Sequence, residues 1–146
     1  MNTPWAHFDG SAQENGCGGG ALLHLSDNHY FKIQMGLGIG TNNFVELITL
    51  RHLLHFALEK ECRHIQIFCD SKVIINRFNN TSICHVHTLR NILDDALLLK
   101  SHFDSICCHH IYREHNQISD QLSKEVTTQP RGLWLIQEQR GLEFYQ

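Results

Sequence analysis

The stretch WAHFDGSAQENGCGGG, residues 5–20, gives the first evidence for the fold, because it predicts a β-strand followed by an acidic residue and a glycine-rich segment. Bulky and small residues alternate from Trp5 to Phe8, which is the pattern of a short β-strand. Asp9 follows at the end of this predicted strand and leads into a loop of polar and glycine residues. Aspartate has a poor strand propensity and loses hydration when it is buried, so the sheet gains nothing from it. We therefore expect Asp9 to serve a function.

Length, composition and charge narrow the possibilities. The 146 residues fit one domain with a sizeable core. A formal net charge of −3 argues against binding of nucleic acid by bulk positive charge, so an anionic substrate would need local basic patches or metal ions. No apolar run approaches transmembrane length and no signal-peptide pattern is present, so we expect no membrane association. Three of the six cysteines, Cys62, Cys69 and Cys107, lie in or beside apolar runs, which favours reduced thiols and an intracellular protein of the cytoplasm or nucleus.

Periodicity predicts an α/β fold with one mixed sheet. Extended runs at 18–25 and 29–36 flank a turn signal, Asp27-Asn28, and predict an antiparallel hairpin. The sequence then predicts a helix from Asn43 with Asn42 or Asn43 as its cap, strands at 64–70 and 105–112, and helices at 87–103 and 116–126. This order predicts five strands, three antiparallel and then two parallel, flanked by helices. Residues 1–126 would form the domain, and residues 127–146 a C-terminal tail packed on it.

Four acidic residues lie at or near the ends of these predicted elements: Asp9, Glu46, Asp70 and Asp120. Asp9 and Asp70 each end a strand predicted to be parallel, and open α/β sheets bind ligands at that edge. Each acid alone is equally typical of a helix-end charge, a strand-end cap or a solvated carboxylate. Four carboxylates brought together would repel one another unless cations bound between them. Their hard oxygen ligands would favour Mg²⁺ or Mn²⁺.

Four short motifs in this order resemble those of type 1 ribonuclease H, from about Trp5 to Lys124. They are Asp9-Gly10-Ser11 with Asn15, TNNFVEL (41–47) with Glu46, Asp70-Ser71, and NQISDQL (116–122) with Asp120. His110 lies ten residues before Asp120, the spacing of the catalytic-loop histidine in that family. The chain is most similar to the compact archaeal, plant-type and retroelement-associated forms. The connection between Phe78 and His87 is too short for the basic protrusion of other members.

The resemblance implies a ribonuclease H-like fold and an endonuclease that hydrolyses the RNA strand of RNA/DNA hybrids, leaving 5′-phosphate and 3′-hydroxyl ends. It implies two Mg²⁺ ions, with Mn²⁺ as a substitute, and two-metal-ion catalysis. Asp9 would bridge both ions, Glu46 and Asp70 would complete one coordination sphere, and Asp120 would hold the other ion. His110 would assist proton transfer or product release, although a strand-end histidine beside an acid is an equally good interpretation.

The family motifs also imply contacts with the hybrid. The implied substrate-binding residues are Asn15, Thr41, Asn42, Asn43 and Ser71. The asparagines would meet 2′-hydroxyls and base edges in the minor groove, and Thr41 would hold a DNA phosphate. Lys72 and Arg77 would replace the missing protrusion in part, or would simply be solvated.

Two alternatives to an active hybrid nuclease stay open. One is a catalytically idle ribonuclease H-like domain that binds nucleic acid within a larger replication or retroelement protein, which the presence of all four acids disfavours. The other is a DNA nuclease or resolvase of the same broad fold, which the Thr41-Asn42-Asn43 pattern disfavours.

Three further patterns carry less weight. CHVH (84–87) and CCHH (107–110) offer zinc ligands, but at a spacing that fits no standard zinc knuckle. GLGIG (36–40) lacks the glycine spacing of a dinucleotide loop and is interpreted as a linker. QRGLEFYQ (139–146) resembles a sliding-clamp-binding peptide with its aromatic residues one place early, so a sliding clamp is a possible partner. We expect a monomer.

Overall fold

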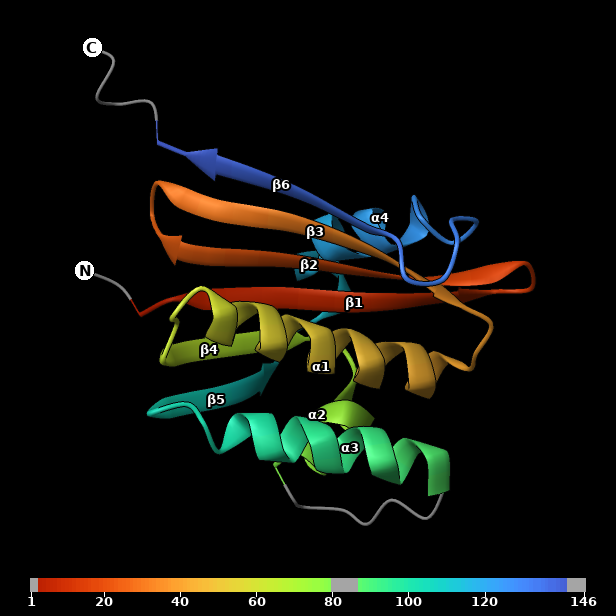
Figure 1. Ribbon diagram of the computed structural model, residues 1–146, viewed down its shortest axis with the longest axis horizontal. Coiled ribbons are helices and arrows are strands. Elements are labelled where there is room, and N and C mark those ends of the chain that lie inside the picture. Colours follow the sequence, from red (N-terminus) through yellow and green to blue (C-terminus); the bar gives the residue numbers. More distant parts are fainter. Residues whose placement is uncertain (1–2, 80–86, 142–146) are drawn as a thin grey trace.

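The structure, a computed structural model, describes residues 3–79 and 87–141. They form one six-stranded sheet with the strand order β5-β4-β1-β2-β3-β6, and helices on both of its faces (Figure 1). The elements in chain order are β1 (Trp5–Gln13), β2 (Gly16–Ser26), β3 (His29–Gly38), α1 (Asn42–Glu59), β4 (His64–Cys69), α2 (Lys72–Phe78), α3 (His87–Lys100), β5 (Ser105–His110), the 3₁₀ turn η1 (Arg113–His115), α4 (Gln117–Lys124) and β6 (Trp134–Arg140). In the described part of the chain, no helix is long and apolar enough to cross a membrane.

The mixed α/β sheet predicted from the sequence is confirmed. β1, β2 and β3 pair antiparallel, while β4 pairs parallel to β1 and β5 parallel to β4. The predicted count of five strands is wrong, because β6 adds a sixth strand antiparallel to β3. The sequence of β6, WLIQEQR, does not alternate apolar with polar residues, and most of its side chains are exposed. Its place in the sheet therefore comes from backbone pairing with β3 and leaves little trace in the sequence.

β1 is longer than the sequence suggested, and this changes the setting of Asp9. The strand continues to Gln13, so Asp9 lies within it rather than at its end. β1 pairs with β4 only from Trp5 to His7, whereas its pairing with β2 continues along the whole strand. Asp9 thus lies just beyond the point where β4 stops pairing with β1, and a gap opens there at the edge of β1.

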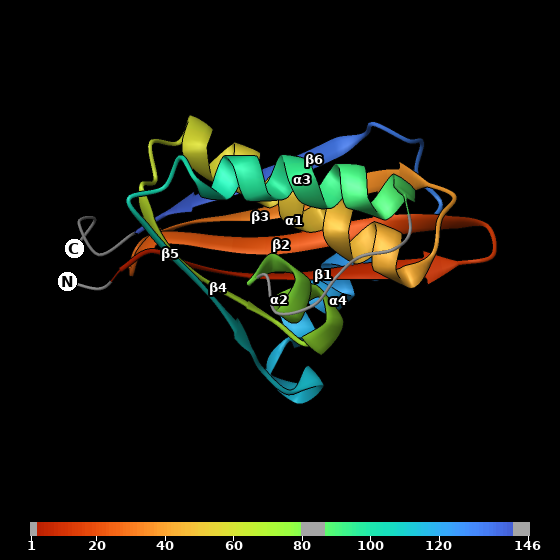
Figure 2. The same ribbon diagram turned by 90° about the horizontal axis from the view of Figure 1, so that it is seen from below.

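Helices cover the two faces of the sheet unequally. α1 and α3 lie together on one face, and α4 lies on the opposite face (Figures 1 and 2). The glycines of β2 let both layers approach closely. A Cβ atom at Gly19 would collide with the side chain of Thr49 in α1, and one at Gly20 would lie 2.6 Å from the backbone nitrogen of Ser123 in α4. A side chain at either position would therefore push a helix away from the strand that carries it.

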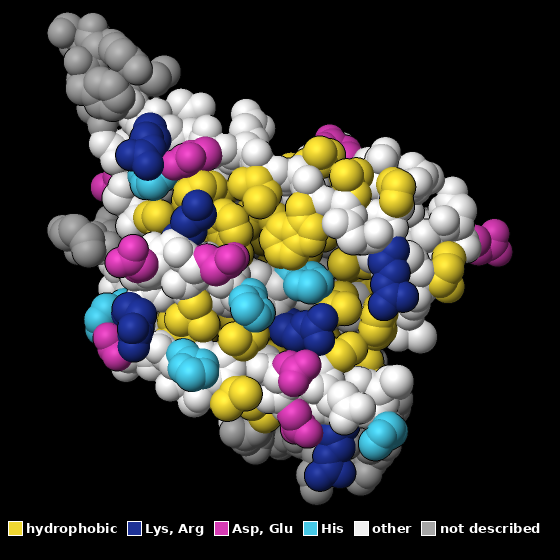
Figure 3. All heavy atoms as spheres, viewed as in Figure 1, with side chains coloured by type: hydrophobic (Ala, Val, Ile, Leu, Met, Phe, Trp, Pro, Cys, Tyr) yellow, Lys and Arg dark blue, Asp and Glu magenta, His cyan; other side chains and the backbone are white. Residues whose placement is uncertain are grey.

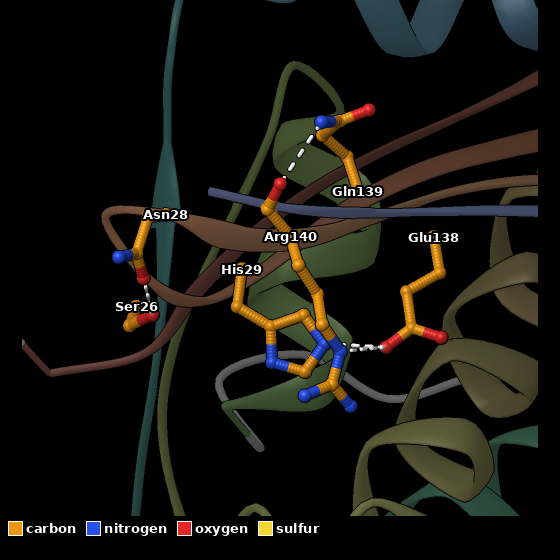
Figure 4. A network of polar contacts seen from close by, with 6 residues as sticks. All are labelled: Ser26, Asn28, His29, Glu138, Gln139 and Arg140. Atoms are coloured by element: carbon orange, nitrogen blue, oxygen red, sulfur yellow. Dashed lines mark hydrogen bonds and ion pairs between the residues drawn. The ribbon is translucent and has the colours of Figure 1, made fainter. Parts of the chain in front are cut away.

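Side-chain contacts on the α1 face add to the backbone pairing of β6. Hydrophobic side chains gather between α1 and β6 (Figure 3), where the Trp134 ring meets the His52 ring at a centroid distance of 5.1 Å. At the far end of the strand, Glu138 Oε2 lies 2.6 Å from His29 Nε2 and 3.1 Å from Arg140 Nε (Figure 4). The Glu138 carboxylate therefore joins β6 to the first residue of β3.

The substitution Gly20→Ala should destabilise the fold. Alanine is the better strand residue by about 0.5–1 kcal/mol, but its Cβ would meet the backbone of α4, and such overpacking typically costs about 1–3 kcal/mol. We expect the free energy of unfolding, measured by urea denaturation, to fall by about 1–2 kcal/mol. Equal or greater stability of the variant would contradict the close packing of α4 on β2.

Candidate active site

Three carboxylates from three different elements meet at the gap beside β1. Asp9 comes from β1, Glu46 from the first turns of α1, and Asp70 from the residue that follows β4. One carboxylate oxygen of each lies within 4.8 Å of the other two. Asp9 and Glu46 are only 7% and 6% exposed, while Asp70 is half-buried. They line a pocket of about 270 Å³ together with Gly10, Asn42, Asn43, Ser71 and Arg113.

Gly10 fixes the distance between two of these acids. Its backbone N–H donates to Asp9 Oδ1 at 2.9 Å and also to Glu46 Oε1. A Cβ atom at position 10 would lie 2.7 Å from Val45 Cγ1 and 3.0 Å from the nitrogen of Glu46. Only glycine therefore lets the first turns of α1 approach β1 closely enough for one N–H to serve both carboxylates.

The crowding of these acids changes their protonation. Burial, together with nearby Asp70 and Asp120, raises the pKa of Asp9 to about 6, against the opposing hydrogen bonds from Glu46 and the Gly10 N–H. Burial also raises the pKa of Glu46 well above its ordinary range, as does Asp9, which accepts a hydrogen bond from protonated Glu46. Without a cation the cluster thus lowers its charge by keeping a proton. A hard divalent cation would remove the need for that proton, and the all-oxygen donor set fits Mg²⁺ or Mn²⁺.

Asp120 lies beside Asp9 but outside the group of three. It belongs to the first turn of α4 and lines a second, neighbouring pocket with Asp9, Asn42, Arg113 and Lys124 among others. Its Oδ2 atom is 2.9 Å from Lys124 Nζ. The structure therefore brings the four predicted acids together, with Asp9, Glu46 and Asp70 in one cluster and Asp120 at its rim.

The start of α4 is joined to this cluster by Asn116. The side chain is buried at 1% exposure, and its Nδ2 donates to the Phe8 carbonyl at 2.9 Å and to Asp70 Oδ2 at 3.4 Å. The Asn116 amide thus links the start of α4 to β1, through Phe8, and to Asp70 at the end of β4. Although Asn116 directly precedes α4, its side chain makes no capping hydrogen bond to that helix.

The predicted catalytic histidine, His110, lies outside the two pockets that contain the acids. His110 ends β5 opposite Cys69, its ring contacts Tyr112 at a centroid distance of 5.7 Å, and it is not among the residues that line either pocket. Arg113, in the connection between β5 and α4, lines both pockets. The sequence did not predict a role for Arg113. The role of His110 stays a prediction.

The predicted substrate-binding residues lie in three places. Asn42, Asn43 and Ser71 line the pocket of the three acids. The Thr41 hydroxyl accepts a hydrogen bond from the Phe44 N–H at 3.2 Å, so Thr41 caps α1 and the predicted cap at Asn42 or Asn43 is wrong. Asn15 is exposed in the turn between β1 and β2.

The remaining motifs lie apart from this site. Most of CHVH and the aromatic residues of the predicted clamp-binding peptide fall outside the described residues. Cys107 to His110 form part of β5 with alternating burial, and they do not converge on one point. Within residues 3–79 and 87–141, the group of side chains that could hold a metal ion is Asp9, Glu46 and Asp70.

Comparisons with known proteins agree with this geometry. Residues 7–126 match the sequence profile of the reverse transcriptase-like family. No curated protein sequence matches the chain. The fold is similar to that of RNase H1 from the halophilic archaeon Halobacterium salinarum NRC-1, with a TM-score of 0.79 and 25% identity over 84% of this chain and 96% of that one.

Two further solved structures share the fold at lower identity. The N-terminal RNase H domain of Rv2228c from Mycobacterium tuberculosis has a TM-score of 0.76 and 21% identity, over 84% of this chain and 91% of that one. LC11-RNase H1, isolated from compost by a metagenomic approach, was solved in complex with an RNA/DNA hybrid and has a TM-score of 0.74 and 20% identity, over 85% of this chain and 96% of that one. Through residues 7–126, the chain therefore belongs to the reverse transcriptase-like family, as an enzyme of the type 1 ribonuclease H class.

Proposed function

We propose that this protein hydrolyses the RNA strand of RNA/DNA hybrids with two divalent cations, leaving 5′-phosphate and 3′-hydroxyl ends. The observation that carries the proposal is the cluster of Asp9, Glu46 and Asp70, whose oxygens lie within 4.8 Å of one another in an open pocket. The similarity to LC11-RNase H1, which was solved with an RNA/DNA hybrid, supports the choice of substrate. The fourth acid, Asp120, lies next to Asp9 and supports a second ion.

Each acid has a distinct part in this proposal. Asp9 lies between the two pockets and would be shared by both ions, with Glu46 and Asp70 on one side and Asp120 on the other. A two-metal centre supplies an activated water nucleophile and stabilises the departing oxygen of the phosphodiester. Mg²⁺ is the proposed ion, with Mn²⁺ as a substitute, because the donors are carboxylate oxygens.

The polar residues around the cluster would select the RNA strand. Asn42 and Asn43 at the start of α1, together with Ser71, line the same pocket as the acids. Their amide and hydroxyl groups can both donate to and accept from a 2′-hydroxyl, the group that distinguishes RNA from DNA in the minor groove. Asn15 and Thr41 are exposed beyond the pocket and would contact the hybrid farther along its length.

The substitution Asp70→Asn tests the assignment directly. Removing one charged ligand weakens metal-based charge stabilisation by several kcal/mol, so hybrid hydrolysis should fall at least about a hundredfold. Labelled RNA/DNA, RNA/RNA and DNA/DNA duplexes would be incubated with wild-type protein and variant, in Mg²⁺ or EDTA. Asp95→Asn, which makes the same change at an exposed ion pair with Arg51, should keep full activity.

Two results of this assay would contradict the proposal. Comparable turnover by Asp70→Asn would remove the carboxylate from the mechanism. Hybrid binding without hydrolysis by the wild-type protein in Mg²⁺ would favour the catalytically idle domain instead.

The raised pKa of Asp9 predicts how pH changes the stability of the metal-free protein. The pKa rises from the ordinary 3.8 to about 6 on folding, so the folded state binds the proton more tightly than the unfolded state. The contribution of Asp9 to stability is therefore full below the lower value and is lost as pH rises through about 6. We expect the difference in Tm between wild-type protein and Asp9→Asn to shift in favour of the variant over this range in EDTA. Saturating Mg²⁺ should abolish the shift, and a pH-independent difference in EDTA would contradict it.

Arg113 and His110 can be separated by their kinetic effects. If Arg113 binds a phosphate, Arg113→Met should raise KM and lower the slope of log K against log salt by about 1. If His110 moves a proton or aids product release, His110→Ala should lower kcat and leave that slope unchanged. Both slopes would be measured from hybrid binding at several salt concentrations. An unchanged slope for Arg113→Met would remove Arg113 from the phosphate path.

A further inference from the structure

The fourth carboxylate of the site is held by a lysine. Lys124 Nζ lies 2.9 Å from Asp120 Oδ2, one helical turn along α4, with the Asp120 side chain 29% and the Lys124 side chain 56% exposed. Both residues line the second pocket together with Asp9. The Lys124 ammonium is therefore paired with Asp120 in the lining of the pocket where a second ion would be bound.

The two pockets differ in their balance of charge. The first contains the carboxylates of Asp9, Glu46 and Asp70 and one cation, Arg113. The second contains the carboxylates of Asp9 and Asp120 and two cations, Arg113 and Lys124. A divalent ion in the second pocket would thus meet fewer acids and more positive charge than an ion in the first.

Buried contacts hold the backbone of α4 against the sheet, whereas its exposed side chains can rearrange without movement of the helix. Asn116 joins the start of the helix to the Phe8 carbonyl and to Asp70, and the backbone of α4 packs against Gly20 of β2. The Lys124 side chain is exposed, and its charge is carried on a flexible stem of four methylene groups. It can leave Asp120 without moving the helix.

We propose that Lys124 is a positioning residue that competes with the second metal ion for Asp120. With Asp120 paired to Lys124, the first ion binds to Asp9, Glu46 and Asp70, and the second ion binds only as the ammonium leaves the carboxylate. The inference rests on the two-ion function proposed above. Its consequence is ordered binding, with a first ion held tightly and a second held weakly because it displaces an existing ion pair.

The test is a titration of the metal-free protein with Mn²⁺, with free Mn²⁺ followed by electron paramagnetic resonance. Wild-type protein should show one tight and one weak site. Lys124→Met keeps the length of the side chain and removes its charge, and should tighten the weak site by about two- to fivefold, the range typical of an exposed ion pair, while leaving the tight site unchanged. Lys124→Arg should restore the weak site to near its wild-type affinity.

A matched control removes the same charge far from the site. Lys60 follows the last residue of α1, and its ammonium lies 5.3 Å from the centroids of the Phe31 and Phe56 rings. Lys60→Met should leave both Mn²⁺ affinities unchanged. Circular dichroism of every variant would check that the fold is kept.

Several outcomes would overturn the inference. An unchanged or weaker second site in Lys124→Met would do so, as would an equal effect of Lys60→Met or a single bound ion in the wild-type protein. Failure of the proposed function is a different result, because it would be seen as absence of hybrid hydrolysis by wild-type protein in Mg²⁺. A wild-type enzyme that hydrolyses the hybrid while Lys124→Met leaves the weak site unchanged would refute only the role of Lys124.

Discussion

Mutual repulsion among Asp9, Glu46 and Asp70 is the constraint on which the rest of the site depends. Two unit charges 4 Å apart repel by about 4 kcal/mol at the effective dielectric constant of a protein surface. Three such pairs would approach the whole stability of a domain, which is about 5–15 kcal/mol. The metal-free site avoids most of this cost by keeping a proton on Glu46 and by the donation of the Gly10 N–H to two of the acids. The surrounding sheet and helices must then hold the three carboxylates together against the repulsion that remains between them.

The topology of the sheet supplies the space for this cluster. Because β4 stops pairing with β1 after His7, the edge of β1 near Asp9 has no neighbouring strand. Asp70 enters the gap from the end of β4, and Glu46 enters from α1 above it. The glycines of β2 let α1 and α4 approach from opposite faces, so that Asp120 reaches Asp9 from the other side. The separation of β4 from β1 after His7 therefore leaves the space in which the four acids come together.

The proximity of the four acids could be predicted because the elements that carry them have strong local sequence signals. Strand and helix periods placed Asp9, Glu46, Asp70 and Asp120 on the right elements, and the family motifs fixed their order. The extension of β1 to Gln13 was missed because Asp9, Gly10 and Ser11 have poor strand propensity, and pairing with β2 overrides that propensity. β6 was missed because its exposed side chains carry no alternation. Arg113 was missed because the direction of the chain after β5 depends on the turn η1, and residue spacing does not give that direction.

The local arrangement of charge explains how a chain with a net charge of −3 can act on a polyanion. Without metal ions, the acids at the centre of the site would repel the phosphates of a hybrid, and Arg113 and Lys124 at its rim would offset only part of that repulsion. Each divalent ion that binds would cancel part of this negative charge close to where the scissile phosphate of the proposed substrate would lie. In the proposed function, substrate binding and ion binding would therefore be coupled, because each would reduce the repulsion that opposes the other. Under the proposed function, a chain whose sequence leaves no room for a basic protrusion would depend on this coupling more than on bulk positive charge, so the ions would contribute to substrate affinity as well as to the reaction.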